Sequence, residues 1–307
     1  MRLEDGSDAV TQHVRVAQEI ETALGEGRAV VALETTLVAH GFPLGEGAEV
    51  GRESERRVRA AGGVPATIGV IDGGIRVGLD ESELERFSAS PEARKVGPRD
   101  LAPCAVQRAL GATTIAGTLA VCRVMGIRFV GTGGLGGVHR GWVDSLDMSA
   151  DLAELARTKA LVVSSGAKSI LDVRATVEVL ESLSVPVLGW RTTEVPLFYQ
   201  AEGGPPVTAR VESSQEAARI ARVHWSLGRG GLLLTRPPDE SLDVEPLIEE
   251  GVREAERQGI RGQDVTPFLL SHLHEASGGR TVGANKRLVA ENAALAAEVA
   301  VAYSASG

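Results

Sequence analysis

Short apolar runs alternate with amphipathic segments along most of the chain. Aliphatic runs of strand length occur at 29–36, 127–134, 160–165, 185–190 and 230–235. Helix-like segments with apolar residues on one face occur at 13–25, 47–60, 150–159, 169–184 and 213–227. Strands and helices that alternate with short connections are typical of a parallel sheet covered by helices. The pattern therefore predicts an α/β fold with a mostly parallel central sheet.

The remaining segments complete this expectation. Asp72-Gly73-Gly74 separates two alternating apolar runs within 66–79 and predicts a hairpin turn. A short helix at 80–87 and a polar loop at 88–100 precede an Ala-rich helical region at 101–125, which is interrupted near Gly111. The last third is mostly helical, with segments at 243–258, 266–276 and 284–303. Because no repeat or linker is visible, we expect one domain, 1–307, with additional C-terminal helices.

Composition narrows the class of protein. Of 307 residues, 43% are hydrophobic but only 3% aromatic, so aliphatic side chains must build the core. A formal net charge of −9 argues against nucleic acid or an anionic membrane as a partner, since both reward a basic surface. Cys104 and Cys122 make no disulfide framework. An acidic start at 1–8 and no run near the roughly 18 apolar residues of a membrane span favour a cytoplasmic protein.

A glycine-rich segment begins at the end of the strand-like run at 127–134. Gly131-Thr132-Gly133-Gly134-Leu135-Gly136 matches the G-x-G-x-x-G pattern of dinucleotide sites. A second glycine-rich polar loop follows it, and no acidic residue ends another strand about 20 residues later, as that fold requires. We therefore expect a backbone cradle for an anion such as phosphate. A nicotinamide-dependent oxidoreductase is the less favoured alternative.

Three polar residues, Asp147, Ser149 and Asp151, lie around the start of the helix predicted at 150–159. Ser149 is a good N-cap, and Asp151 is favoured in a first turn by the helix dipole. Ordinary capping explains these two residues but not Asp147. Two carboxylates four residues apart around a loop also suit a hard divalent cation such as Mg²⁺ or Mn²⁺.

Lys168 is one of only four lysines among 32 basic residues. Ser169 and Asp172 form a plausible capping box, which would place Lys168 just before a helix N-terminus. The dipole disfavours a cation there and favours the neutral, nucleophilic amine. A solvated lysine is the alternative.

An acidic residue, a second lysine and three histidines are further candidates for the site. Glu34 ends an apolar strand, where partial burial would raise its pKa and suit it to acid–base chemistry; its alternative is a loop-capping carboxylate. Lys95 lies in a polar loop and is either a phosphate anchor or a solvated charge. His139 lies in a loop, where it is free to contact phosphate or move a proton. His272 and His274 are two apart on a helix, point in different directions, and are interpreted as structural.

Eight motifs, in order along the chain, resemble those of pseudouridine-5'-phosphate glycosidase, a family that includes the protein once called indigoidine synthase A. The resemblance covers about residues 15–303. Its motifs are VALETTLVAHG (31–41), PATIGVI (65–71), KVGPRDL (95–101), GATTIAGT (111–118), GTGGLGGVHRG (131–141), DMSADL (147–152), SGAKSILD (165–172) and TPFLL (266–270).

The resemblance implies reversible cleavage of pseudouridine 5'-phosphate to uracil and ribose 5-phosphate by a homotrimer of α/β/α sandwich subunits. It implies Lys168 as nucleophile, Glu34 as proton donor, and Asp147 as ligand of Mn²⁺ or another divalent cation. The substrate-binding residues that it implies are Lys95, Ile115, Ser149, Ala150, Asp151, Thr132, His139 and Asn285. An amine nucleophile suits a carbon–carbon glycosidic bond. A sugar-phosphate binder, or a related enzyme of pigment biosynthesis, is the alternative function.

Overall fold

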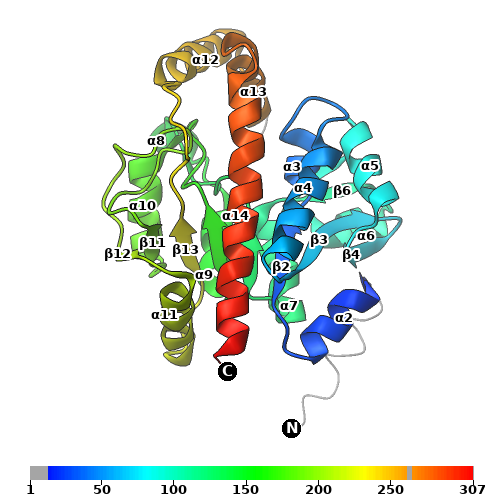
Figure 1. Cartoon of the computed structure of the whole chain (residues 1–307). Helices are drawn as coiled ribbons and strands as arrows, with labels where there is room; N and C mark the ends of the chain where they lie inside the picture. Colours follow the sequence, from blue (N-terminus) through cyan, green and yellow to red (C-terminus); the bar gives the residue numbers. More distant parts are fainter. Residues whose placement is uncertain (1–12, 261–264, 307) are drawn as a thin grey trace.

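The computed structural model describes residues 13–260 and 265–306 (Figure 1). The acidic segment 1–8 lies outside the described residues. An eleven-stranded sheet forms the centre of the molecule. Its strands are β1 (Val14–Val16), β2 (Val30–Glu34), β3 (Val64–Ile71), β4 (Gly74–Val77), β5 (Arg94–Val96), β6 (Gly111–Thr113), β7 (Phe129–Gly131), β9 (Leu161–Ser164), β11 (Val187–Trp190), β12 (Ala209–Val211) and β13 (Leu232–Thr235). Strands β8 (Val138–His139) and β10 (Leu171–Asp172) form a separate pair.

The sheet is mostly parallel. The strand order is β1-β4-β3-β2-β7-β9-β13-β11-β12, with β6 paired to β3 and β5 paired to β6. Strand β3 is antiparallel to β4 and β6, whereas the other pairs in the sheet are parallel. The α/β class predicted from the alternating pattern is therefore confirmed, as is the hairpin at Asp72-Gly73-Gly74.

Helices cover both faces of the sheet. Val31 and Leu33 pack on one face with α4 (Gly47–Ala60), α11 (Ser214–Ser226) and α14 (Arg280–Ala305). Their neighbours Val30 and Ala32 pack on the other face. The helices of that face are α2 (Gln18–Gly25), α7 (Ile115–Met125), α9 (Ala150–Arg157) and α10 (Val173–Ser182). Strands buried on both faces carry continuous apolar runs, which is why the central strands were readable from sequence.

Helix α14 crosses the sheet in front of its central strands (Figure 1). It has the length and mean hydropathy of a membrane span, although the sequence holds no uninterrupted apolar run. Here 56% of its apolar window is buried inside the protein, so this composition reflects a core position. The helix pair α12 (Glu245–Gln258) and α13 (Val265–Ala276) lies beyond one end of the sheet, next to the start of α14 (Figure 1).

Several short elements differ from the sequence-based expectation. The helix expected at 13–25 is a strand, β1, followed by α2. A one-turn helix, α3 (Thr36–His40), follows β2 between the run at 29–36 and the helix at 47–60. The polar loop at 88–100 and the interruption near Gly111 contain β5 and β6, which pair with each other. These two strands separate α5 (Glu81–Ala89), α6 (Leu101–Val106) and α7. Three-residue strands are too short to show a period of two, so tertiary pairing decides them.

The contact between α14 and β7 yields a stability prediction. A Cβ added at Gly131 would lie 2.8 Å from the Cα of Ala293 in α14. Because both partners are backbone, Gly131→Ala must shift the helix or the strand. We expect it to lower the free energy of unfolding by roughly 1–3 kcal/mol, the usual cost of overpacking.

Urea denaturation followed by circular dichroism measures this loss. Gly25→Ala is the matched control, because a Cβ there meets nothing within 4 Å at the end of a helix. Equal unfolding free energies for the two variants would contradict the prediction.

Candidate active site

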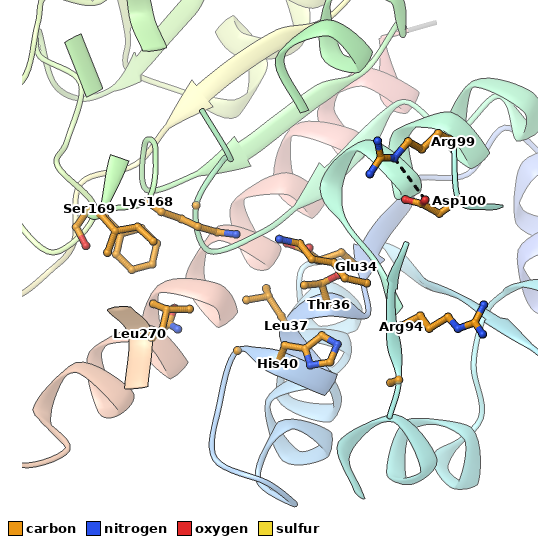
Figure 2. Close-up of a pocket in the computed structure, with 17 residues that line it drawn as sticks. Glu34, Thr36, Leu37, His40, Arg94, Arg99, Asp100, Lys168, Ser169 and Leu270 are labelled. Carbon is orange, nitrogen blue, oxygen red and sulfur yellow. Dashed lines mark ion pairs between the residues drawn. The ribbon is translucent and has the colours of Figure 1, made fainter. Parts of the chain in front are cut away.

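The site lies at the carboxyl ends of the central strands. Glu34, Gly131 and Ser164 are the last residues of the adjacent strands β2, β7 and β9. Parallel sheets place their ligand sites at this edge. Two cavities of about 510 Å³ and 720 Å³ open there. They share one wall, formed by Glu34, Thr36, Lys95, Arg99, Asp100 and Lys168 (Figure 2).

Glu34 is a buried carboxyl group, with 5% of its surface exposed. Burial raises its pKa to about 7, while the charge of Lys168 and the Thr132 hydroxyl oppose this rise. The Thr132 hydroxyl donates to Glu34 Oε1 at 2.5 Å. Near neutral pH the carboxyl group is thus present in both protonation states, as an acid–base catalyst requires. The sequence-based expectation of a raised pKa at this strand end is confirmed.

Lys168 enters the cavities from the loop after β9, and its side chain extends towards Glu34 (Figure 2). The capping box predicted at Ser169 is wrong. Helix α10 begins at Val173, and its N-cap is Asp172, which accepts the amide of Ala175 at 2.9 Å. Lys168 therefore does not sit at a helix N-terminus, and the dipole argument fails. Instead its amide donates to the carbonyl of Leu135 at 3.1 Å, which ties the lysine to the glycine-rich loop.

Lys95 supplies a second amine from β5. The residue retains contact with solvent, yet protein atoms around the ammonium group lower its pKa, and the charge of Lys168 lowers it further. The Asp151 and Glu34 carboxylates oppose this shift. The wall between the two cavities thus carries two amines and one buried carboxyl group, which makes it attractive to an anion.

The glycine-rich loop, expected to form an anion cradle, braces its neighbours through three of its amides. The amides of Thr132 and Leu135 donate to the carbonyls of Val163 and Gly166, and the amide of Gly136 donates to Asp151. These groups are already bonded to protein oxygens, so they are not free for phosphate. The loop leads into β8 and not into a helix, which also removes the dinucleotide interpretation.

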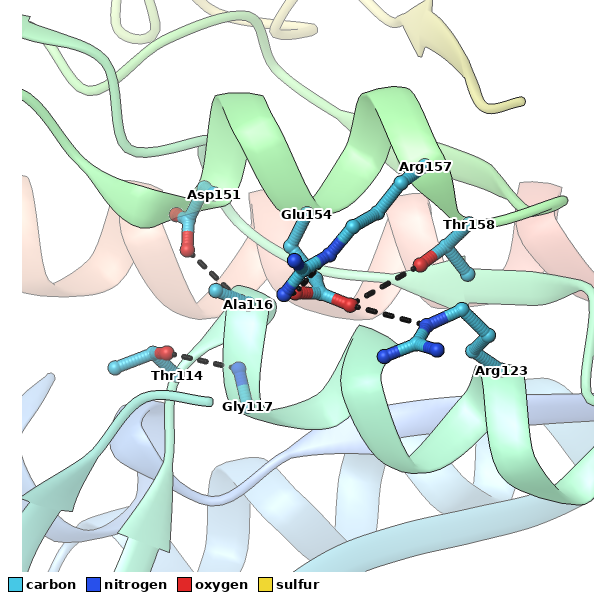
Figure 3. A network of polar contacts seen from close by, with 8 residues as sticks. All are labelled: Thr114, Ala116, Gly117, Arg123, Asp151, Glu154, Arg157 and Thr158. Atoms are coloured by element: carbon cyan, nitrogen blue, oxygen red, sulfur yellow. Dashed lines mark hydrogen bonds and ion pairs between the residues drawn. The ribbon is translucent and has the colours of Figure 1, made fainter. Parts of the chain in front are cut away.

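A pair of helix N-termini at the larger cavity is another candidate site for an anion. Helices α7 and α9 both begin at the larger cavity, where Ile115 and Ala150 are lining residues. Ser149 caps α9 as predicted and accepts the amide of Asp151 at 3.2 Å. Buried Asp151 in turn accepts the amides of Ala116 in α7 and Gly136 in the loop, at 2.8 and 2.9 Å (Figure 3). Converging helix N-termini favour an anionic group such as phosphate.

A buried ion pair network holds these two helices together (Figure 3). Glu154 of α9 is almost fully buried and binds both Arg157 of its own helix and Arg123 of α7. The Thr158 hydroxyl donates to the same carboxylate. Because this network joins α7 to α9, it fixes the relative positions of their N-termini.

Asp147 and His139 form the far side of the larger cavity. His139 lies in β8, not in a loop, and its Nδ1 is 3.8 Å from Asp147 Oδ2. Burial lowers the pKa of His139, and the Asp147 charge opposes this shift. The expected carboxylate pair is not equivalent, because both oxygens of Asp151 accept backbone amides. Among residues 13–260 and 265–306, no three His, Cys, Asp or Glu side chains form a metal cluster. Asp147 therefore fits a cation that is otherwise bound by water and a phosphate oxygen.

The smaller cavity has an apolar wall that sequence reasoning missed. Its lining residues include Leu37, His40, Phe198 and Leu270, with Asn285 of α14 beside them. Leu37 and His40 are three apart in α3, directly after Glu34, and this spacing was a usable signal. Phe198 lies in irregular chain with no such signal. His272 and His274 do not line either cavity.

Comparison with known proteins identifies the family. The family model described as indigoidine synthase A like protein matches residues 19–302. The chain belongs to the indigoidine synthase A-like family. Relatives named pseudouridine-5'-phosphate glycosidase include one from Salinispora tropica, 47% identical over 97% of this chain and 94% of the relative. Another, from Chloroflexus aurantiacus, is 46% identical over 96% of this chain and the whole relative.

Solved structures of the same fold agree. The prealnumycin C-glycosynthase AlnA, in complex with ribulose 5-phosphate, matches with a TM-score of 0.88 and 42% identity. The match covers 96% of this chain and 98% of AlnA. An indigoidine synthase A-like protein from Thermotoga maritima matches with a TM-score of 0.84 and 39% identity, over 94% of this chain and 96% of that one.

The raised pKa of Glu34 predicts a pH-dependent stability. Because the folded-state pKa, about 7, exceeds the ordinary value of 4.5, the folded protein holds this proton more tightly. The resulting stability is present below pH 4.5 and is lost as the pH rises through 7, up to about 3 kcal/mol. Glu34→Gln removes the ionisation, so the variant should be more stable than the wild type at pH 8, and this advantage should disappear near pH 4.5.

Denaturant titrations at pH 5, 6, 7 and 8 measure the difference. Glu202→Gln, at an exposed position, is the control and should follow the wild type throughout. A Glu34→Gln curve parallel to the wild type would show that the carboxyl group does not titrate in this range.

Proposed function

We propose that this chain reversibly cleaves the C-glycosidic bond of pseudouridine 5'-phosphate, giving uracil and ribose 5-phosphate. The observation that carries the proposal is a lysine amine and a buried carboxyl group at the junction of two unlike cavities. One cavity is apolar and suits a nucleobase, and the other ends at two helix N-termini and suits a phosphate. The relatives named pseudouridine-5'-phosphate glycosidase support the same assignment.

An amine is the appropriate nucleophile for this bond. In ordinary glycosides a carboxylic acid protonates the leaving oxygen, but here the leaving atom is a carbon of uracil. A covalent adduct with an amine allows the carbon–carbon bond to break, because the nitrogen lone pair stabilises the resulting cation as an iminium. Lys95 and Lys168 both line the two cavities, and the family resemblance implies Lys168 as the nucleophile.

The proposed steps balance in protons and electrons. Glu34 protonates the ribose ring oxygen while Lys168 Nζ bonds to the anomeric carbon, and the ring opens. The amine then loses a proton to Glu34, and its lone pair expels uracil, whose carbon takes that proton from Glu34. Water adds to the iminium carbon, the proton released in this hydrolysis returns to Glu34, and ribose 5-phosphate leaves with the neutral amine restored. The net reaction consumes one water molecule.

The phosphate is placed in the larger cavity. Ile115 and Ala150, the first residues of α7 and α9, line it at the positive ends of the two helix dipoles, and Lys95 adds a positive charge. Ile115, Ser149, Ala150 and Asp151 all line this cavity, which fits the substrate contacts implied by the resemblance. Thr132 would act on the substrate indirectly, because its hydroxyl donates a hydrogen bond to the carboxyl group of Glu34.

A divalent cation, Mn²⁺ by preference, is part of the proposal. Asp147 would hold it with water and phosphate oxygens as the other ligands, and the ion would neutralise charge on the sugar phosphate.

We further propose a homotrimer in the cytoplasm. A related C-glycoside-forming enzyme or a sugar-phosphate binder is the second candidate, favoured by the similarity to AlnA. Uracil release from pseudouridine 5'-phosphate, followed by absorbance, separates these candidates.

Trapping of the covalent adduct tests the nucleophile. With ribose 5-phosphate and borohydride, we expect the mass of the reduced sugar on a peptide that contains Lys168. Lys168→Ala should lose uracil release by at least about 10³-fold, as expected for removal of a nucleophile. Lys159→Ala, at an exposed position, is the control and should be trapped and turn over normally. Labelling at another lysine, or none, would contradict the mechanism.

Metal binding tests the role of Asp147. Chelation should suppress uracil release, and Mn²⁺ should restore it. Electron paramagnetic resonance with ribose 5-phosphate present should show Mn²⁺ bound to the wild type and roughly 10- to 100-fold weaker binding to Asp147→Asn. Asp144→Asn, exposed in the short helix α8 (Trp142–Ser145) three residues earlier, is the matched control. Full activity after chelation would remove the metal from the proposal.

A further inference from the structure

Phe198 has a backbone conformation that few residues of its type adopt. Its φ is +65°, in the left-handed region that favours glycine. The residue is buried, its amide donates to the carbonyl of Ser165 at 3.1 Å, and its ring packs edge-to-face on Tyr199 at 4.6 Å. Such strain persists only where the surrounding structure enforces it, and it is concentrated at functional sites.

The strained residue places its ring beside Lys168. A Cβ added at Gly134 would lie 2.6 and 2.7 Å from two Phe198 ring carbons and 3.2 Å from Lys168 Cγ. Phe198 and Lys168 therefore flank the same glycine, and both line the smaller cavity. Only a residue without a side chain at 134 leaves room for both the ring and the aliphatic part of the Lys168 side chain.

The rest of this wall suits a flat ring with polar edges. Leu37, Ile170 and Leu270 are apolar lining residues. Asn285 is 3% exposed, and its Oδ1 has no hydrogen-bond partner among the described residues. A buried amide oxygen without a donor is costly, so a ligand N–H is its natural partner.

We propose that Phe198 is the residue that selects the nucleobase, by stacking on the uracil ring that leaves the anomeric carbon bonded to Lys168. This inference rests on the proposed function and adds to it a specificity-determining contact. Ribose 5-phosphate has no ring that reaches this wall, so the formation of its adduct with Lys168 does not depend on Phe198. Stacking of a base on an aromatic side chain changes binding by about 10- to 100-fold.

Phe198→Leu removes the aromatic face and tests the proposal in two assays. In the synthetic direction, with ribose 5-phosphate saturating, the KM for uracil should rise at least about 10-fold. Borohydride trapping of ribose 5-phosphate on Lys168 should stay within about twofold of the wild type. Phe198→Tyr keeps the ring and should restore the KM. If circular dichroism shows that the leucine variant is unfolded, Phe198→Met, which has similar volume and no ring face, replaces it.

A second aromatic position provides the control, and different outcomes would contradict the inference and the proposed function. Phe129→Leu removes a buried ring that packs on Trp225 and Tyr303, and it should leave the KM for uracil unchanged. An unchanged KM in Phe198→Leu, or a parallel loss of trapping that indicates a merely structural role, would overturn the inference. A wild-type protein that neither traps ribose 5-phosphate nor releases uracil would overturn the proposed function itself.

Discussion

The close approach of α14 to the glycine-rich loop is the constraint on which the site depends. Ala293 packs against Gly131 where β7 ends, and one turn of helix holds the loop beyond it. The side-chain amide of Asn292 donates to the carbonyls of Thr132 and Gly133 and to the Ser165 hydroxyl. The helix thereby fixes Thr132, which bonds to Glu34, and it fixes the strand-end loop that carries Lys168. Displacement of α14 would therefore disturb Glu34, Lys168 and the glycine-rich loop together.

Burial of the Glu34 carboxyl group at the carboxyl ends of the strands lowers stability and suits function. A carboxyl group with few water contacts is destabilised when ionised, and the two nearby amines recover only part of that loss. The same burial raises the pKa of Glu34 into the range where it can both give and accept a proton. Asp151 shows the opposite solution, because two backbone amides stabilise its carboxylate. The two buried carboxylates thus differ in their partners, since Glu34 accepts from one side-chain hydroxyl and Asp151 accepts from two backbone amides.

The central strands and the main helices were predictable because each carries a local signal. The run at Val30–Glu34 is buried on both faces, and Ser149 and Ser213 are N-caps as their positions suggested. Residues placed by distant contacts were not predictable. Lys168 appeared to precede a helix, but its position depends on the carbonyl of Leu135, far away in the sequence. Phe198 likewise becomes a cavity residue only because Gly134 lies next to its ring.

The two cavities differ in the residues that line them. Ile115 and Ala150, the first residues of α7 and α9, line the larger cavity, whereas Leu37 and Phe198 line the smaller one, and Lys168 lines both. The glycine-rich loop holds Lys168 at this junction, because the amide of Lys168 donates to the carbonyl of Leu135 and the amide of Leu135 donates to the carbonyl of Gly166. In the proposed mechanism, an amine at such a junction keeps the sugar phosphate on one side while the base separates on the other. Synthesis and cleavage would then differ only in whether uracil or water reaches the iminium carbon first.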